Sequence, residues 1–263
     1  MNDHIITILS DLGTRDTSLA VMKAALMNYT KGAPIVDISH NIVANDLQQA
    51  AYIMSTACRY FPAGSIHVLC VSVFAGDAPC ILLAERDGHY FIAPDNGILP
   101  LTFGIETGNT QLCFACKKPD QFREWVNNAG QVIESVMNGN TAQFPVYTIL
   151  IVPRLLQPIV LPDAIDCNIL HIDRYENVVL NIKRKQFEDA VMNRLFRIKV
   201  MRHKDITTIS NNYNEVPEGA PLARFNDAGY LEIASNHGSA KALLGLKEDA
   251  SVYKTIKIFL APR

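Results

Sequence analysis

A carboxylate directly follows the first apolar segment of the chain. The run Ile5-Ile6-Thr7-Ile8-Leu9 leads into Ser10-Asp11-Leu12-Gly13-Thr14. A short apolar run with β-branched residues predicts a strand buried on both faces, as in the middle of a parallel sheet. Open α/β sheets bind ligands at the carboxyl ends of such strands, and Gly13 allows a tight turn there. We therefore interpret Asp11 as a ligand-binding carboxylate; the alternative is that it caps the next helix.

A second polar turn follows a later apolar segment. Pro94-Asp95-Asn96-Gly97 comes directly after Tyr90-Phe91-Ile92-Ala93. This composition is typical of a tight turn, and it also brings a carboxylate and an amide to a strand end. Asp95 and Asn96 are therefore candidate ligand-binding residues, with an ordinary turn as the alternative.

Alternating strands and helices must position these groups in the first half of the chain. Strands are predicted at 5–9, 34–38 and 66–73, and apolar residues recur at helical spacing within 19–29 and 47–58. A hairpin is predicted from 81–84 and 90–93, and a further helix over 122–136. This alternation predicts an α/β fold with a doubly wound, largely parallel sheet.

The composition changes after the last of these helices. Prolines at 145, 153, 158 and 162 exclude a helix interior in this stretch. Short β-type segments follow at 169–172, 178–182, 195–200, 222–225, 230–234 and 252–260, which suggests a small β-barrel or sandwich. We expect an N-terminal domain over 1–150, a proline-rich linker over 151–165 and a C-terminal β-domain over 166–263.

Composition and charge point to a small-molecule partner. The chain has 263 residues, of which 49% are hydrophobic, enough for a substantial core. Its 24 basic and 26 acidic residues give a net charge of -2 without a basic run, so we expect no nucleic-acid partner. No stretch approaches the ~20 apolar residues of a membrane span and the start lacks a leader pattern, so we expect a cytoplasmic protein without membrane contact.

The cysteines read as core residues rather than as a redox or metal site. Most of the six lie inside apolar runs, where a free thiol behaves as a small hydrophobe. Cys113-Phe114-Ala115-Cys116 has CxxC spacing, but it lies in an apparent strand and lacks the helix N-terminus that activates such thiols. A zinc site needs two further ligands, and none is evident, so no metal or cofactor is predicted.

A series of motifs runs in order along almost the whole chain. The first half contains Ser10-Asp11-Leu12-Gly13-Thr14-Arg15-Asp16, Ile35-Val36-Asp37-Ile38-Ser39-His40, Phe61-Pro62-Ala63-Gly64-Ser65-Ile66-His67-Val68 and Pro94-Asp95-Asn96-Gly97. The second half contains Ile172-Asp173-Arg174-Tyr175-Glu176-Asn177 and Gly229-Tyr230-Leu231-Glu232-Ile233-Ala234-Ser235-Asn236-His237-Gly238-Ser239-Ala240. This series resembles the S-adenosyl-L-methionine (SAM) hydroxide adenosyltransferases, adenosine-forming hydrolases related to the fluorinase and the chlorinase.

The resemblance implies a fold, an assembly and a set of ligand contacts. It implies a Rossmann-like N-terminal domain, a C-terminal β-barrel, and a homotrimer that binds SAM between neighbouring subunits. By position, Asp11 would hold the ribose hydroxyls, Tyr175 would pack near the adenine and Asn177 would read its edge. Asp173 would face the ammonium group of the methionine portion. Without the resemblance, Tyr175 reads as a core residue and Asn177 as a turn residue.

The chain departs from the family pattern where water is activated. Relatives carry Val-Asp-Pro-Gly-Val-Gly and an Arg after the third strand, and later a His-Gly-Arg-Asp segment; the Asp, the Arg and the His activate the attacking water. Here Ser72 stands in the place of the Asp and Pro79 near the place of the Arg. The His segment is not recognisable, and counting back from Gly139 brings Glu124 near it. Ser72 and Glu124 are thus the candidate residues at degenerate catalytic positions.

A second departure concerns the amino-acid end of the ligand. Asp227-Ala228 aligns with positions that hold the methionine carboxylate in relatives, and an aspartate there would face a like charge. Asp227 is kept as a candidate ligand-binding residue, together with Asn236 and His237 of the last motif.

Three classes of function follow from these observations. The first is an active SAM hydrolase, for which the lost triad predicts weak or altered activity. The second is a non-catalytic protein or sensor that binds adenosine or SAM. The third is an enzyme that acts on another nucleoside through Asp77, Glu124 or Asp95. Because one fold supports many chemistries, the site must decide among them.

Overall fold

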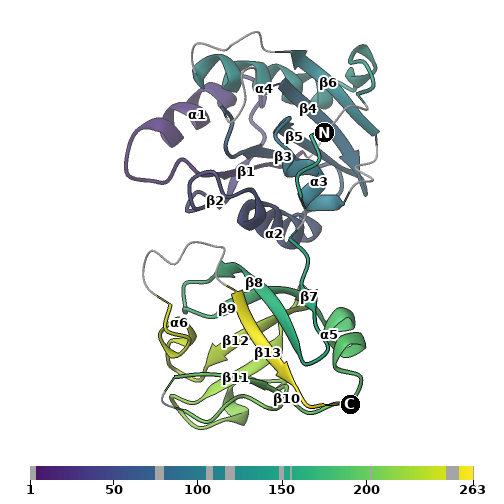
Figure 1. The fold of residues 1–263 in the computed structure, drawn as a ribbon. Helices are drawn as coiled ribbons and strands as arrows, with labels where there is room; N and C mark the ends of the chain where they lie inside the picture. The colour runs from purple at the N-terminus through teal and green to yellow at the C-terminus, as the bar shows by residue number, and fades with distance from the viewer. Residues whose placement is uncertain are drawn as a thin grey trace. The chain divides into compact units, whose positions relative to one another are not determined.

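The protein folds into two compact units, Met1–Arg154 and Leu155–Arg263. The computed structural model describes residues 4–74, 80–104, 109–115, 122–147, 151–154, 156–201, 203–246 and 255–262 (Figure 1). Each unit has its own hydrophobic core. The finer division into 1–150, 151–165 and 166–263 stays a prediction.

A six-stranded mixed sheet forms the centre of the first unit. Its strands are β1 (Ile6–Ser10), β2 (Ile35–Ser39), β3 (Ile66–Cys70), β4 (Cys80–Arg86), β5 (His89–Pro94) and β6 (Asn109–Ala115). They lie in the order β2-β1-β3-β5-β4-β6, and β4 runs antiparallel to both of its neighbours while the other pairs are parallel. Every residue of β1 is buried, and the strand pairs on both sides, as the apolar run predicted.

Helices cover both faces of this sheet (Figure 1). They are α1 (Ser18–Met27), α2 (Leu47–Ala57), α3 (Ile98–Phe103) and α4 (Phe122–Met137), with a short 3₁₀ turn at Cys58–Tyr60 and another at Thr141–Gln143. Met22 and Leu26 of α1 share one core with Trp125 of α4. Helices α1 and α4 pack closely. Gly130 of α4 has no side chain, and a Cβ at this position would overlap the ring of Tyr29, which follows α1. Helices α2 and α3 pack on the other core of the unit.

The second unit is a curled antiparallel sheet, a half-barrel. Its strands are β7 (Ile159–Val160), β8 (Ala164–Ile172), β9 (Val178–Lys183), β10 (Phe196–Ile198), β11 (Pro221–Phe225), β12 (Tyr230–Ser235) and β13 (Thr255–Leu260). The order is β10-β13-β8-β9-β12-β11, with β7 paired to β8. Strand β8 pairs with β13 over 164–168 and with β9 over 169–172, and the second pairing contains an irregularity between Ile169 and His171. This change of partner bends β8 and curls the sheet.

Several short elements were absent from the sequence-based prediction. They are the helices α3, α5 (Arg184–Val191) and α6 (Ala240–Leu243), the two-residue strand β7, and the 3₁₀ turns, including one at Tyr213–Glu215. The hairpin predicted from 81–84 and 90–93 is confirmed as β4 and β5.

Burial raises the pKa of the Cys113 thiol to about 12, so this half of the CxxC pair stays a thiol; Cys116 lies outside the described residues. Within the described ranges, no helix is long and apolar enough to cross a bilayer.

A buried histidine pair in the first unit makes its stability depend on pH. His67 on β3 is fully buried, with Nδ1 2.7 Å from Thr7 Oγ1 and Nε2 3.1 Å from His89 Nδ1. Burial, and then the nearby His89, lower the pKa of His67 from 6.5 to about 3. In the unfolded chain this imidazole is protonated below about pH 6.5, whereas in the folded protein it stays neutral down to about pH 3. Protonation between these two values therefore favours the unfolded state.

We expect the free energy of unfolding to fall as the pH drops below 6.5. Between pH 7.5 and pH 5, linkage through His67 contributes a loss of about 2 kcal/mol. Urea unfolding at the two pH values measures it. His67→Phe removes the titrating group and should lose that part of the dependence, whereas His203→Gln, at an exposed histidine, should keep it. Equal pH dependence in all three proteins would contradict the assignment.

Candidate functional site

The carboxylate of Asp11 joins three loops at the carboxyl ends of parallel strands. Its Oδ2 accepts hydrogen bonds from the backbone N–H of Asn45, 3.0 Å away, and of Ser72, 3.1 Å away. Asn45 precedes α2 and Ser72 follows β3. The Oδ1 atom accepts no hydrogen bond from the described part of the chain. Asp11 does not cap α1, because that helix begins at Ser18, whose N–H donates to Asp16.

Ser72 is held in place by its backbone. Its C=O accepts a hydrogen bond from Asn96 Nδ2 at 3.1 Å, and the same amide donates to Val71 O at 2.9 Å. Asn96 Oδ1 in turn accepts the N–H of Ile98. Ser72 is buried and has a φ of +48°, in the left-handed region that costs energy for any residue but glycine. Asp11, Ser72 and Asn96 therefore form one connected network at this edge of the sheet.

His40 contacts Ser10 and Gly13, which lie before and after Asp11 in the chain. The sequence alone did not reveal these contacts. The Nδ1 atom of His40 lies 2.7 Å from Ser10 Oγ, and its C=O accepts the N–H of Gly13 at 2.8 Å. Its Nε2 lies 3.1 Å from Asp37 Oδ1, within ion-pair distance but without the alignment of a hydrogen bond. The available signal was the Asp37-x-x-His40 spacing, with Asp37 inside β2 and His40 directly after it. The contacts indicate that His40 fixes the position of the Asp11 loop.

The carboxylate of Asp95 binds a different part of the chain. Its Oδ2 accepts a hydrogen bond from Tyr147 OH at 3.0 Å, and its Oδ1 accepts the N–H of Ile151 at 3.1 Å. Burial first, and then the Asp95 carboxylate, raise the pKa of Tyr147 to about 12. Both oxygens thus hold the chain that follows Pro145. Its predicted role toward a ligand stays a prediction.

Glu124 lies on the exposed face of the first turn of α4. This turn approaches the loop after β3, because the rings of Phe74 and Phe122 meet edge to face with centroids 6.5 Å apart. Asp77 and Pro79 lie outside the described residues. The degenerate role assigned to Glu124 therefore stays a prediction.

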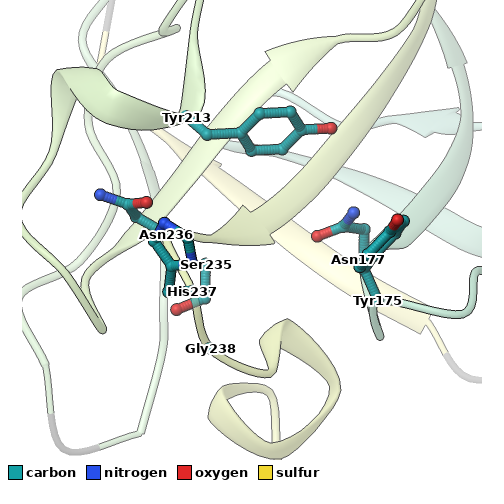
Figure 2. Close-up of a pocket in the computed structure, with 7 residues that line it drawn as sticks. All are labelled: Tyr175, Asn177, Tyr213, Ser235, Asn236, His237 and Gly238. Atoms are coloured by element: carbon teal, nitrogen blue, oxygen red, sulfur yellow. The ribbon is translucent and has the colours of Figure 1, made fainter.

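A pocket of about 420 Å³ opens in the second unit (Figure 2). Its lining consists of the loop between β8 and β9, the 3₁₀ turn and the end of β12: Tyr175, Asn177, Tyr213, Ser235, Asn236, His237 and Gly238. Its volume is in the range of small-molecule sites. The structure thus brings together four of the residues predicted from the sequence, from two motifs that are about sixty positions apart. Tyr213, Ser235 and Gly238 were missed as pocket residues.

The loop from Asp173 to Asn177 forms one wall. Asp173 Oδ1 accepts the backbone N–H of Tyr175 and of Asn177, both at 2.9 Å. Asp173 Oδ2 accepts Asn177 Nδ2, also at 2.9 Å. Tyr175 is 79% exposed although its backbone is ordered by these bonds, whereas Asn177 is only 5% exposed. An exposed aromatic ring beside a pocket is a feature of ligand contact rather than of a core.

The opposite wall carries a buried acid behind an aromatic ring. Tyr213 OH donates to Glu232 Oε1 at 2.9 Å, and the guanidinium carbon of Arg224 lies 4.7 Å from the centre of the Tyr213 ring. Burial raises the pKa of the Glu232 carboxyl. These contacts fix the Tyr213 ring against the pocket.

The end of β12 completes the pocket. Asn236 Nδ2 donates to Val216 O at 2.8 Å, and Ser235 Oγ donates to Gly219 O at 3.1 Å. His237 follows with a φ of +54°. Asp227 lies in the exposed turn before β12, at the other end of that strand, and does not line the pocket.

Two family models match the chain in succession. The SAM hydroxide adenosyltransferase N-terminal domain matches residues 6–128, and the SAM hydroxide adenosyltransferase C-terminal domain matches residues 167–253. The chain is 29% identical to an (R)-S-adenosyl-L-methionine hydrolase of Thermus thermophilus, over 94% of this chain and 98% of that protein. It is 26% identical to the (R)-S-adenosyl-L-methionine hydrolase of Methanocaldococcus jannaschii, over 92% of each. A fluorinase of Actinoplanes sp. is 24% identical over 95% of this chain and 97% of its own.

Solved structures share the fold over the same length. An uncharacterized conserved protein from Thermotoga maritima has a TM-score of 0.80 at 22% identity, and it covers 97% of this chain and 99% of its own. A conserved hypothetical protein from Thermus thermophilus has a TM-score of 0.72 at 25% identity, over 98% and 100%. The likeness therefore extends through both units.

Proposed function

The chain belongs to the family of SAM hydroxide adenosyltransferases, and we propose that it binds SAM through the adenosyl half and hydrolyses it slowly to adenosine and methionine. The observation that carries the proposal is the pocket of the second unit. There, residues from separate motifs of the family series, Tyr175, Asn177 and His237, line one cavity of about 420 Å³. Relatives named as SAM hydrolases match over more than nine-tenths of the chain.

The pocket suits a purine base. The rings of Tyr175 and Tyr213 offer faces on which a base stacks, and such stacking is worth about 1–3 kcal/mol per base. Asn177 supplies both a hydrogen-bond acceptor and a donor, as an adenine edge requires. Tyr175 is the residue most available to a ligand, because it is 79% exposed.

The ribose would be held by Asp11. Its Oδ1 is free of hydrogen bonds from the described part of the chain, and a carboxylate oxygen is a strong acceptor for a hydroxyl. Asp11 and Asn177 belong to different compact units. As the family resemblance implies, we propose a homotrimer in which these residues come from neighbouring copies. Light scattering should give three times the chain mass of 29.2 kDa, and a monomer would contradict this assembly.

Hydrolysis needs water activated at C5′ of the adenosyl group. The water oxygen bonds to C5′, the C5′–S bond breaks with its electron pair on sulfur, and a proton leaves the water. The products are adenosine and methionine, in which the positively charged sulfonium of SAM has become a neutral thioether. A serine hydroxyl at position 72 offers no charge with which to take up that proton. We therefore expect slow turnover, and the same residue favours the second candidate function, a non-catalytic adenosine or SAM sensor.

Thermal unfolding with added ligand tests the proposed binding. Adenosine and SAM should each raise the melting temperature, because a ligand at a hundred times its Kd adds about 2.7 kcal/mol of stability. Cytidine is the control ligand. Tyr175→Ala should lower the affinity for adenosine about tenfold or more, and Tyr60→Ala should not, because Tyr60 is a similarly exposed tyrosine of the first unit, outside the pocket. No shift with either adenosine or SAM would reject the proposed function.

A further inference from the structure

The loop from Asp173 to Asn177 fixes the orientation of a side-chain amide. We propose that Asp173 is a positioning residue that turns Asn177 Oδ1 into the pocket and so makes the pocket select a 6-amino purine over a 6-oxo purine. The inference rests on the proposed adenosyl binding and adds to it a determinant of base specificity. It assigns Asp173 a role other than contact with the ammonium group of the ligand.

The chemistry of the two side chains determines the orientation. A carboxylate only accepts hydrogen bonds, so the amide group that faces Asp173 Oδ2 at 2.9 Å must be the NH₂ of Asn177. The Oδ1 atom then lies on the other side of the amide. Figure 2 shows it directed across the pocket toward Ser235 and His237. It accepts no hydrogen bond from the described part of the chain, which leaves it available to a ligand.

An acceptor at this point discriminates at position 6 of a purine. The 6-amino group of adenine donates to such an oxygen, whereas the 6-oxo group of hypoxanthine presents a second acceptor and repels it. The NH₂ of Asn177 has a second hydrogen, which can donate to a ring nitrogen of the base. Adenine thereby satisfies the amide, and hypoxanthine leaves a buried acceptor unpaired.

The hydrogen-bond acceptor positions of the Asp173 carboxylate are mostly occupied within its own loop. Three N–H groups, the backbone N–H of Tyr175 and of Asn177 and the side chain of Asn177, occupy three of its roughly four acceptor positions. A residue with this role acts on the ligand through Asn177.

The variant Asp173→Asn should reverse the amide. The new side chain must keep an oxygen toward the N–H groups of Tyr175 and Asn177, which brings its own NH₂ against the NH₂ of Asn177. Asn177 then rotates by half a turn and presents a donor to the pocket. We expect adenosine to bind about tenfold or more weakly and inosine correspondingly more tightly, as measured by calorimetry on the full chain.

Asp163→Asn is the matched control. It makes the same chemical change in the exposed turn before β8, outside the pocket. It should leave the ratio of adenosine to inosine affinity unchanged. SAM is measured beside the two nucleosides, because a carboxylate that contacts the ammonium group would weaken SAM and leave that ratio unchanged.

The outcomes separate this inference from the proposed function. A preference for adenosine in the unmodified protein that survives Asp173→Asn overturns the inference and leaves adenosyl binding intact. If the unmodified protein binds neither adenosine nor SAM, the proposed function fails, and the amide orientation is then judged by NMR. One side-chain hydrogen of Asn177, assigned by its loss in Asn177→Asp, should exchange slowly in the unmodified protein and rapidly in Asp173→Asn. Rapid exchange of both hydrogens in the unmodified protein also overturns the inference.

Discussion

The unmodified protein should release adenosine from SAM at least about 10²-fold more slowly than a variant that carries Ser72→Asp together with Pro79→Arg. General acid–base assistance contributes about 10²–10⁴-fold to a rate, or roughly 3 to 5 kcal/mol of barrier. A serine hydroxyl cannot take up the proton of the attacking water, and a proline offers no cation. The two substitutions restore the charged groups that the family resemblance implies at these positions.

The surroundings of Ser72 can accept an aspartate. Its φ of +48° lies in the left-handed region, which aspartate tolerates better than most residues. Ser72 also lies beside Asp11, whose Oδ2 accepts its N–H at 3.1 Å. Two neighbouring carboxylates raise the pKa of one of them, which brings it closer to the value of a useful base. Position 79 lies outside the described residues, so the choice of arginine rests on the resemblance alone.

Adenosine release by the purified proteins is followed by chromatography. Thr208→Asp, which adds a carboxylate at an exposed position of the second unit, serves as the control and should leave the rate unchanged. If the double variant is no faster than the unmodified protein, then the missing charges are not the cause of slow turnover. If the unmodified protein already matches relatives that keep all three groups, the interpretation of Ser72 as a lost function is wrong.

The elements with strong local patterns could be predicted from the sequence. The buried strand β1 and the hairpin of β4 and β5 were predicted, because both depend on residues that are close in the chain. Helix α3 was missed because Pro100 reads as a helix breaker, although a proline is tolerated in a first turn, and α3 begins at Ile98. Helix α5 was missed because its eight residues lie inside a β-rich stretch.

The candidate site was predictable in its residue types and less so in its contacts. Tyr175 and Asn177 were found through a motif, but Tyr213 lies in an irregular turn without periodicity and reaches the pocket only through the tertiary fold. The direction of a carboxylate is equally hidden from the sequence. Asp95 follows its strand as Asp11 follows β1, yet its oxygens bind Tyr147 and Ile151.

Replacement of Asp11 by asparagine should remove the discrimination between ribose and a sugar without hydroxyls. Asparagine keeps one oxygen for the N–H groups of Asn45 and Ser72, so the three loops stay joined. Its NH₂ then takes the place of Oδ1, where the ligand requires an acceptor. Hydrogen bonds to a charged group are worth about 1.5–3 kcal/mol, so adenosine should bind roughly 10- to 100-fold more weakly.

Calorimetry with adenosine and 2′,3′-dideoxyadenosine separates this effect from damage to the fold. The unmodified protein should prefer adenosine strongly, and Asp11→Asn should bind both nucleosides about equally, because the lost interaction is specific to the hydroxyls. Asp16→Asn is the matched control: its carboxylate accepts the N–H of Ser18 at the start of α1, five residues further along the same loop, and its substitution should leave the preference intact. An equal loss for both nucleosides in Asp11→Asn would instead assign Asp11 to holding the loops together, since a carboxylate that only joins Asn45 and Ser72 has no means of sensing the ribose hydroxyls.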